Sequence, residues 1–230
     1  MSDPRLPSPW GPRWARWVGR FLARVVWATE VVGRENVPGD GPVLLAANHT
    51  GIVDGPILLG VAPRPAHVLV KEEMFVGPVG WVLRAAGQIP VDRTGGRPAL
   101  TAGHGVLRRG DVVGIFPEGN RGRGDVSDAR AGAAWLALNG RAPVVPVAVL
   151  GTRRTGESVN KIPGLRRRMV VQFGAPISVQ RGPGMTGREA LEAANTAIRV
   201  AMADVVVAAQ ARSGVTLPTD DPLRERQREV

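Results

Sequence analysis

Short, mostly apolar runs alternate along this chain with segments whose hydrophobic residues recur at helical spacing. The apolar runs predict strands at residues 43–47, 67–71, 88–93, 112–116, 143–150 and 169–173. Helical spacing and capping residues predict helices at residues 55–61, 77–86, 98–110 and 129–139, and a long final helix from Thr186 to about residue 210. This alternation of strands and helices predicts an α/β fold.

An earlier helix, predicted at residues 13–28, separates large apolar residues from arginines. One side carries Trp14, Trp17, Val18, Phe21, Leu22 and Val25, and the other carries Arg13, Arg16, Arg20 and Arg24. So many arginines exclude a spanning helix, which needs about twenty mostly apolar residues. The pattern fits a helix lying in the plane of a membrane interface, and equally an ordinary amphipathic helix packed on the core.

These patterns divide the chain into three parts. Residues 1–35 form an N-terminal arm with the amphipathic helix, and residues 36–212 form the main domain. Residues 213–230 are polar and charged and contain proline, so we expect a disordered tail there.

The net charge of +10 predicts a polyanionic partner, and both nucleic acids and anionic bilayers qualify. Aromatic residues make up only 4% of the chain, and no zinc-finger or RNP pattern occurs, which disfavours nucleic acid. We therefore expect an anionic membrane surface as the partner. No signal-peptide pattern appears, so a cytoplasmic location is the simpler expectation. With no cysteine and no histidine pair at zinc-binding spacing, we expect no metal site.

Candidate catalytic groups follow the first predicted strand. The strand leads into Asn48 and His49, and Asp54 lies five residues after the histidine. A neutral imidazole can take a proton from a hydroxyl, and a carboxylate can fix its tautomer and stabilise the imidazolium. Taken alone, this short pattern more often marks a histidine that caps a turn and an aspartate that caps the next helix, because short motifs match by chance.

Two further predicted strands also end at polar groups. Arg93 ends the third strand, and Glu118 and Arg121 follow the fourth in a loop rich in glycine and arginine. The carboxyl ends of strands in an open α/β sheet converge on one crevice, so we expect these groups to meet His49. A histidine–aspartate pair beside two arginines suits a substrate with a hydroxyl and a phosphate, which arginine binds bidentately.

These residues belong to four blocks that closely resemble the PlsC-type glycerolipid acyltransferase family, the 1-acylglycerol-3-phosphate acyltransferases. In order, the blocks are Asn48-His49-x4-Asp54, Gly87-x-Ile89-x-Val91-x-Arg93, Phe116-Pro117-Glu118-Gly119-Asn120-Arg121 and Val145-Pro146-Val147-Ala148. Four blocks in register are far more specific than one, so the resemblance favours the catalytic interpretation of His49. It implies a mixed, mostly parallel sheet flanked by helices, here preceded by the amphipathic helix.

The resemblance implies that His49 and Asp54 are catalytic. His49 would act as general base on the free hydroxyl of lysophosphatidic acid, which attacks the thioester of acyl-CoA or acyl-carrier protein to give phosphatidic acid. The substrate-binding residues that it implies are Asn48, Lys71, Arg93, Glu118, Gly119, Asn120, Arg121 and Pro146. Arg93 and Arg121 would hold the acceptor phosphate, and Glu118 would position Arg121 or the acceptor hydroxyl. No cofactor is expected, since the acyl donor is a co-substrate.

Two features depart from the family pattern. Asn120 stands where the family usually has a hydroxyl residue, which puts that hydrogen bond to substrate in doubt. Family members often carry N-terminal membrane-spanning helices, whereas this chain offers one short amphipathic helix. We therefore expect peripheral attachment to the cytoplasmic face of the cell membrane.

Other functions remain open on the sequence alone. The same chemistry could act on another acceptor, such as glycerol-3-phosphate, a lyso-aminolipid or a glycolipid. A non-catalytic basic protein that binds anionic membranes or nucleic acid is a candidate from another class. A serine hydrolase is disfavoured because no G-x-S-x-G elbow occurs.

Overall fold

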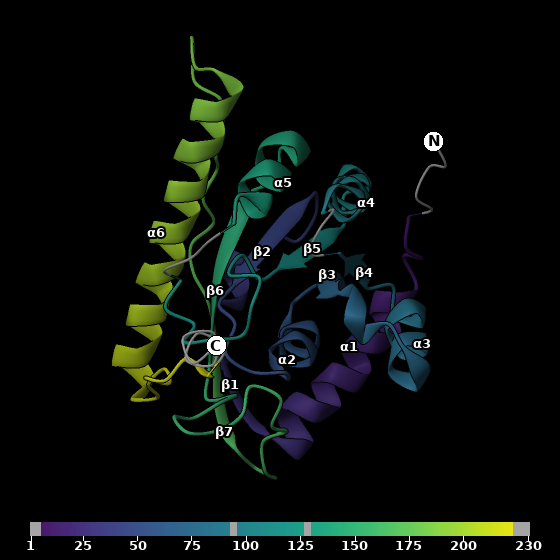
Figure 1. Cartoon of the computed structure of the whole chain (residues 1–230), viewed down its shortest axis with the longest axis vertical. Coiled ribbons are helices and arrows are strands. Elements are labelled where there is room, and N and C mark those ends of the chain that lie inside the picture. Colours follow the sequence, from purple (N-terminus) through teal and green to yellow (C-terminus); the bar gives the residue numbers. More distant parts are fainter. Residues whose placement is uncertain (1–5, 93–95, 127–129, 223–230) are drawn as a thin grey trace, which may run out of the picture.

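A seven-stranded sheet forms the centre of the molecule (Figure 1). The computed structural model describes residues 6–92, 96–126 and 130–222. The strands are β1 (Ala28–Val32), β2 (Val43–Ala47), β3 (Ala66–Lys71), β4 (Ile89–Val91), β5 (Val112–Ile115), β6 (Val144–Leu150) and β7 (Arg168–Phe173). Their order across the sheet is β1-β7-β6-β2-β5-β3-β4. All neighbouring strands pair in parallel except β6 and β7, so the expected mixed, mostly parallel sheet is confirmed.

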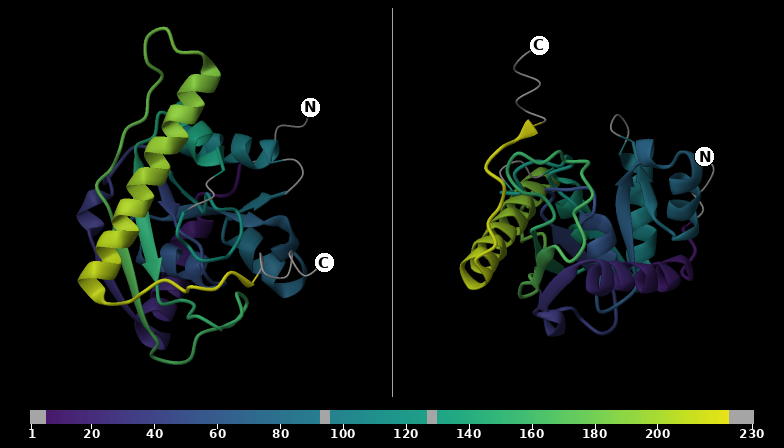
Figure 2. Two further views of the ribbon diagram at one scale, coloured as in Figure 1. Left: turned by 60° about the vertical axis from the view of Figure 1, so that its left-hand side comes forward. Right: turned by 90° about the horizontal axis from the view of Figure 1, so that it is seen from below.

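Helices cover both faces of this sheet (Figures 1 and 2). The helices are α1 (Gly11–Phe21), α2 (Asp54–Val61), α3 (Gly77–Ala85), α4 (Arg97–Arg108), α5 (Gly132–Gly140) and α6 (Gly187–Ser213). Short helical turns follow at η1 (Leu22–Val26), η2 (Arg34–Asn36) and η3 (Glu72–Met74). Strand β2 feeds two cores, because successive side chains point to opposite faces. Leu45 packs in the core beside α2, and Leu44 packs in the core beside α4, α5 and α6.

The N-terminal helix ends earlier than predicted and leads into a strand. Helix α1 passes into a π-helical turn that ends at Val26, and β1 then pairs in parallel with β7. We predicted a helix to residue 28 and no strand here. The reason is that β1 is an edge strand and is only half-buried, so Thr29 and Glu30 are tolerated in it and no continuous apolar run marks it.

Helix α1 packs on α2 through its small residues. The residues that α1 buries are Gly11, Pro12, Ala15 and Gly19. A Cβ atom at Gly19 would lie 2.7 Å from the backbone nitrogen of Gly60 in α2, so both glycines are needed for the close approach. The large residues stay outside, with Trp10 68%, Trp17 70% and Phe21 56% exposed. Within the described part of the chain, no helix is long and apolar enough to cross a membrane.

The segment after α6 contradicts the expectation of a disordered tail from residue 213. Residues 214–222 run back across the molecule (Figure 2, left) and contact the loop between β6 and β7. Asp220 accepts hydrogen bonds from the buried Arg153, and the Leu217 backbone donates to Gln210. The polar composition predicted disorder because the partner of Asp220 lies in a loop that is distant in the sequence. Residues 223–230 of the predicted tail lie outside the described residues.

Candidate active site

Three adjacent strands bring predicted site residues to one edge of the sheet. The carboxyl end of β2 leads into the turn that carries His49, β5 leads to Glu118, and β3 ends at Lys71. Because β5 pairs in parallel with both β2 and β3, the three ends lie side by side. Arg93, predicted to join them from the strand that became β4, lies outside the described residues.

His49 and Asp54 form the pair that the sequence predicted. The Nδ1 atom of His49 lies 2.8 Å from Oδ2 of Asp54. The same oxygen accepts the backbone N–H groups of Thr50 at 2.7 Å and Gly51 at 2.9 Å. Asp54 is fully buried in the first turn of α2. An ionised carboxylate only accepts hydrogen bonds, so Nδ1 carries the proton and Nε2 keeps the lone pair that a general base needs.

The imidazole of His49 is held from several directions. Its ring stacks on Phe116, with ring centres 4.3 Å apart and planes 22° from parallel. The backbone N–H of Gly122 donates to the His49 carbonyl at 3.0 Å. The His49 side chain is nevertheless 15% exposed, so a substrate can reach it. A fixed, accessible base is the arrangement that proton abstraction requires.

Glu118 lies against the backbone of His49. Its Oε1 accepts the His49 backbone N–H at 2.9 Å. Burial raises the pKa of Glu118 to about 8, the His49 N–H opposes this rise, and the carboxylates of Asp125, Asp54 and Asp221 add to it. We predicted that Glu118 would position Arg121 or the acceptor hydroxyl. The contact that the structure gives it instead orients the His49 backbone.

Gly119 serves the loop conformation. It has φ of +68°, in the left-handed region that glycine tolerates best. Its N–H donates to the Phe116 carbonyl at 3.0 Å, which closes the turn around Glu118. A Cβ atom at this position would lie 2.8 Å from Nε of Arg130. Backbone geometry therefore explains the glycine without a contact to substrate.

Two predicted substrate-binding residues are buried in the sheet region. The amide of Asn48 is fully buried, donates to the Val149 carbonyl at 3.1 Å and accepts the Val149 N–H at 2.7 Å. Pro146 is buried within β6, in register with Ala46 of β2. These contacts argue that both residues build the scaffold of the site instead of touching substrate. Local sequence could not distinguish the two roles.

A polar cluster lies beside Glu118. The ammonium of Lys71 donates to Oδ1 of Asn120 at 2.9 Å. Arg121 donates through Nη1 to Oδ1 of Asn160 at 2.7 Å. Asn120, which replaces the family's hydroxyl residue, is thus bonded to the cation of Lys71 and followed in the chain by Arg121. Such a cluster can hold an anionic group of a substrate.

The sequence did not predict the contacts that residues after β6 make with the turn that carries His49. The Thr50 and Thr152 hydroxyls, both buried, hydrogen bond at 2.8 Å. Next to Thr152, the Arg153 guanidinium donates to the Gly122 carbonyl at 3.1 Å, in the same peptide loop that binds His49. Polar residues directly after a buried strand were the available signal.

The other two histidines lie outside this cluster. His67 is buried, donates from Nδ1 to the Gly87 carbonyl and accepts from Arg109. Burial lowers the pKa of His67 and favours its neutral form. His104 contacts the Asn139 carbonyl. Among the residues that the structure describes, no group of three or more His, Asp or Glu residues could hold a metal ion.

Known proteins support a family assignment. The profile of the family described as Acyltransferase matches residues 28–150. A 1-acyl-sn-glycerol-3-phosphate acyltransferase of Bacillus subtilis (strain 168) is 32% identical over 172 residues, covering 74% of this chain and 83% of that protein. This chain belongs to the Acyltransferase family. The PlsC-type resemblance is thereby confirmed, and the chain is an acyltransferase of the kind that serves phospholipid synthesis.

Two further comparisons place this acyltransferase among its relatives. A 1-acyl-sn-glycerol-3-phosphate acyltransferase of Pseudomonas aeruginosa is 33% identical over 141 residues, covering 59% of this chain and 54% of that protein. The crystal structure of the 1-acyl-sn-glycerophosphate (LPA) acyltransferase from Thermotoga maritima matches with a TM-score of 0.62 and 20% identity. That match covers 84% of this acyltransferase and 78% of the Thermotoga chain, and it supports the fold.

Proposed function

We propose that this acyltransferase transfers an acyl group from acyl-CoA or acyl-carrier protein to the free hydroxyl of lysophosphatidic acid, giving phosphatidic acid. The observation that carries the proposal is the pair of His49 and Asp54, 2.8 Å apart, which leaves Nε2 of His49 as the base. The Bacillus and Pseudomonas relatives, whose names state this acceptor, support the choice of lysophosphatidic acid.

The reaction follows from this geometry. Nε2 of His49 takes the proton of the acceptor hydroxyl while the hydroxyl oxygen bonds to the thioester carbonyl carbon. The carbon–sulfur bond then breaks, and the imidazolium returns the proton to the leaving thiolate. Buried Asp54 stabilises the imidazolium in between. General-base help of this kind contributes ~10²–10⁴ in rate.

The polar cluster beside Glu118 suits the acceptor phosphate. Lys71, which bonds to Asn120, and Arg121, the residue after it, supply the cationic donors. The amide of Asn120 can replace the family's hydroxyl as a polar contact, since an amide both donates and accepts. Arg93 completes this phosphate site in the proposal, on the strength of the sequence resemblance alone.

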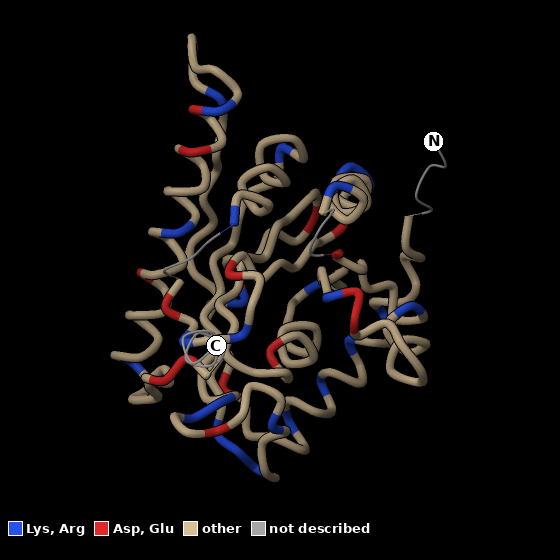
Figure 3. The backbone as a smooth tube through the Cα atoms, in the orientation of Figure 1, with Lys and Arg blue, Asp and Glu red and all other residues tan. Residues whose placement is uncertain are grey.

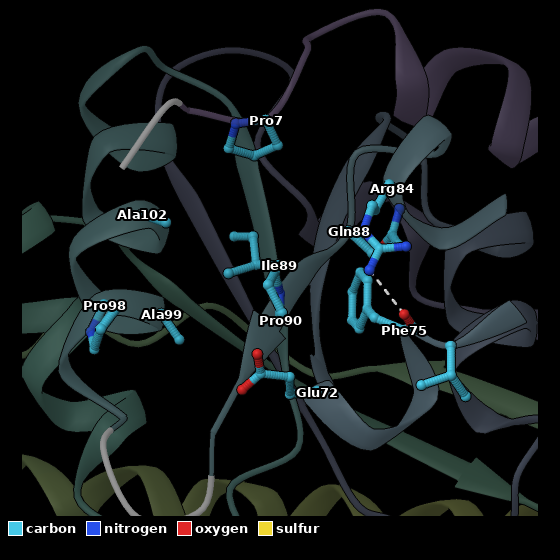
Figure 4. Close-up of a pocket in the computed structure, with 11 residues that line it drawn as sticks. Pro7, Glu72, Phe75, Arg84, Gln88, Ile89, Pro90, Pro98, Ala99 and Ala102 are labelled. Atoms are coloured by element: carbon cyan, nitrogen blue, oxygen red, sulfur yellow. Dashed lines mark hydrogen bonds between the residues drawn. The ribbon is translucent and has the colours of Figure 1, made fainter. Parts of the chain in front are cut away.

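An apolar cavity beside β4 supplies room for an acyl chain (Figure 4). Its volume is about 570 Å³, and its walls include Phe75, Ile89 and Ala102. Arg84 lies in the wall with its guanidinium donating to the Phe75 carbonyl at 2.8 Å. Glu72, the residue after Lys71, also lines the cavity, so it begins next to the proposed phosphate site. Small-molecule sites are often such largely apolar clefts.

The exposed side of α1 suits an anionic bilayer as the partner. Trp10 and Trp17 project from it, and Arg13 and Arg20 lie over their rings, 4.4 and 5.1 Å from the ring centres. Figure 3 shows further Lys and Arg positions along this helix. Tryptophan prefers headgroup depth, and arginine binds lipid phosphates. We propose peripheral attachment at the cytoplasmic face of the cell membrane.

The decisive experiment measures free thiol released from acyl-CoA by purified protein, with and without lysophosphatidic acid. We expect release that requires the acceptor, is lost in His49→Ala and is retained in the matched control His104→Ala. The same assay with acyl-carrier protein as donor, and with glycerol-3-phosphate or other lysolipids as acceptor, identifies the preferred substrates. Absence of transfer with every donor and acceptor, together with tight vesicle binding, would favour the non-catalytic membrane protein.

A further inference from the structure

The loop between β6 and β7 presents two outward-facing aliphatic side chains. Ile162 is 71% exposed and Leu165 is 77% exposed, the highest values among the large hydrophobic residues that the structure describes. Pro163 and Gly164 lie between them at the tip. Isolated exposed hydrophobics are ordinary, but two at one loop tip form an apolar patch that needs a partner.

The tip is fixed in place, so its exposure is built into the fold. Pro163 is buried, and its carbonyl accepts the indole N–H of Trp27 at 3.1 Å. The backbone N–H of Arg166 donates to the Val26 carbonyl at 2.7 Å, and its guanidinium donates to the Arg24 carbonyl at 3.2 Å. The loop tip is therefore attached to the last turn of the N-terminal helix (Figure 1).

The surroundings of the tip are strongly cationic. Between residues 154 and 168 there are five arginines or lysines and one acidic residue, Glu157. Glu157 pairs with Lys161 and Arg167, so the loop keeps a net positive charge. Figure 3 shows these cations gathered where the loop and the end of α1 lie. Aliphatic side chains surrounded by cations match an anionic bilayer. The side chains can enter the boundary between headgroups and acyl chains, and the cations can bind the lipid phosphates.

We infer that residues 161–166 form a second membrane contact, in which Ile162 and Leu165 enter the headgroup boundary of an anionic bilayer. Lys161 and Arg166 bind lipid phosphates beside them. The contact continues the proposed membrane surface of α1, because Arg166 bonds to the carbonyls on both sides of Val25, which is 54% exposed. An anionic membrane explains both the apolar tip and its cations. A protein partner would need an apolar pocket for the tip and acidic groups for the cations.

The same loop reaches the candidate active site. Asn160, next to Lys161, accepts the hydrogen bond from Arg121 at 2.7 Å. The carbonyl of Val159 accepts the backbone N–H of Ile52, in the turn between His49 and Asp54, at 3.1 Å. Docking of the tip on a bilayer would therefore bring the arginine side of the site to the level of lipid headgroups, where a lysophospholipid acceptor presents its phosphate.

The first test uses the absence of cysteine in this chain to place one environment-sensitive fluorophore. Ile162→Cys is labelled and mixed with vesicles of phosphatidylglycerol and phosphatidylcholine. The control is Val207→Cys on α6, where the side chain is 63% exposed and lies outside the loop. We expect a blue shift at position 162 on the anionic vesicles and none at position 207. Unchanged emission at position 162 in vesicle-bound protein would overturn the inference.

The second test measures vesicle partitioning of the double variant Ile162→Ser/Leu165→Ser by sedimentation. Each aliphatic side chain that enters the bilayer contributes part of its transfer free energy to binding. Loss of both side chains therefore predicts a partition coefficient about 10- to 100-fold lower. The matched control Val200→Ser/Val207→Ser on α6 should bind as the parent protein does. Equal binding by both double variants, or equal loss in both, would contradict a contact at the loop tip.

An activity comparison separates this inference from the proposed function. The Ile162→Ser/Leu165→Ser variant should lose turnover of an acceptor embedded in vesicles and keep turnover of a short-chain, monomeric lysophosphatidate. Equal loss on both acceptors would show damage to the site and would overturn the membrane role. The labelling and sedimentation tests remain decisive even if the parent protein acylates neither acceptor, because they measure membrane contact without turnover.

Discussion

Arg153 and Asp220, 67 positions apart, form an ion pair that connects the C-terminal segment to the loops around His49. The Nη1 atom lies 2.9 and 3.0 Å from the two carboxylate oxygens, and the Arg153 side chain is 1% exposed. The Nη2 atom donates to the Gly122 carbonyl, and the Gly122 N–H donates to His49. A residue that we predicted in a disordered tail thus supports the loop beside His49.

We predict that Asp220→Asn lowers the free energy of unfolding by about 2 kcal/mol, below the ~3–5 kcal/mol typical of a fully buried pair, because Asp220 is partly exposed. The buried Arg153 guanidinium would lose its counter-charge. Urea unfolding measures the change. The exposed Asp204→Asn on α6 changes charge equally and should leave stability within a few tenths of a kcal/mol. Equal stability of the two variants would contradict the pairing.

The raised pKa of Glu118 predicts a pH-dependent stability. Burial holds this pKa at about 8 in the folded protein, above its ordinary value of 4.5. Between those values the folded state binds more protons than the unfolded state, so stability falls as pH rises through the window. Glu118→Gln keeps an acceptor for the His49 N–H without titrating. We expect the stability of the parent protein relative to this variant to decline from pH 5 to 8; a constant difference would argue against the raised pKa.

Arg121 offers a test of the phosphate site. Arg121→Ala should lower kcat/KM for lysophosphatidic acid about 10- to 100-fold, chiefly through KM, because a charge-assisted hydrogen bond contributes roughly 1.5–3 kcal/mol. An acceptor without phosphate, such as monoacylglycerol, should be affected little. The exposed Arg199→Ala on α6 is the matched control. A loss of the same size on both acceptors would assign Arg121 a general structural role.

The close contact between Gly19 and Gly60 predicts that a larger residue at either position would push α1 away from α2. A Cβ atom at Gly60 would lie 2.1 Å from the Gly19 carbonyl carbon, whereas a Cβ atom at Gly55, on the same helix, has open space. Gly60→Ala should therefore cost roughly 1–3 kcal/mol. Gly55→Ala should be neutral or slightly stabilising, because alanine favours the helix. Thermal unfolding compares the two variants. Similar melting temperatures would contradict a close contact between α1 and α2 at Gly60.

The sequence by itself predicted most of the architecture and the chemistry proposed for the site. The apolar runs predicted β2, β5 and β6 because strands buried on both faces need apolar residues throughout, and a mostly apolar run predicted β7. The spacing of His49 and Asp54 allowed their pairing, and the four blocks in register favoured it over two separate capping residues. The four blocks in register then identified the family, which the comparisons confirmed.

Only the tertiary structure showed which of the predicted residues bond to the protein's own backbone. The amide of Asn48 is hydrogen bonded to the Val149 backbone, and burial beside His49 raises the pKa of Glu118. Neither the hydrogen bonds nor the burial can be inferred from neighbouring residues in the sequence. The edge strand β1 and the segment around Asp220 were missed because their stability comes from partners far along the chain. Local patterns report which side chains are present, whereas burial and counter-charges depend on long-range contacts, and these set each side chain's role.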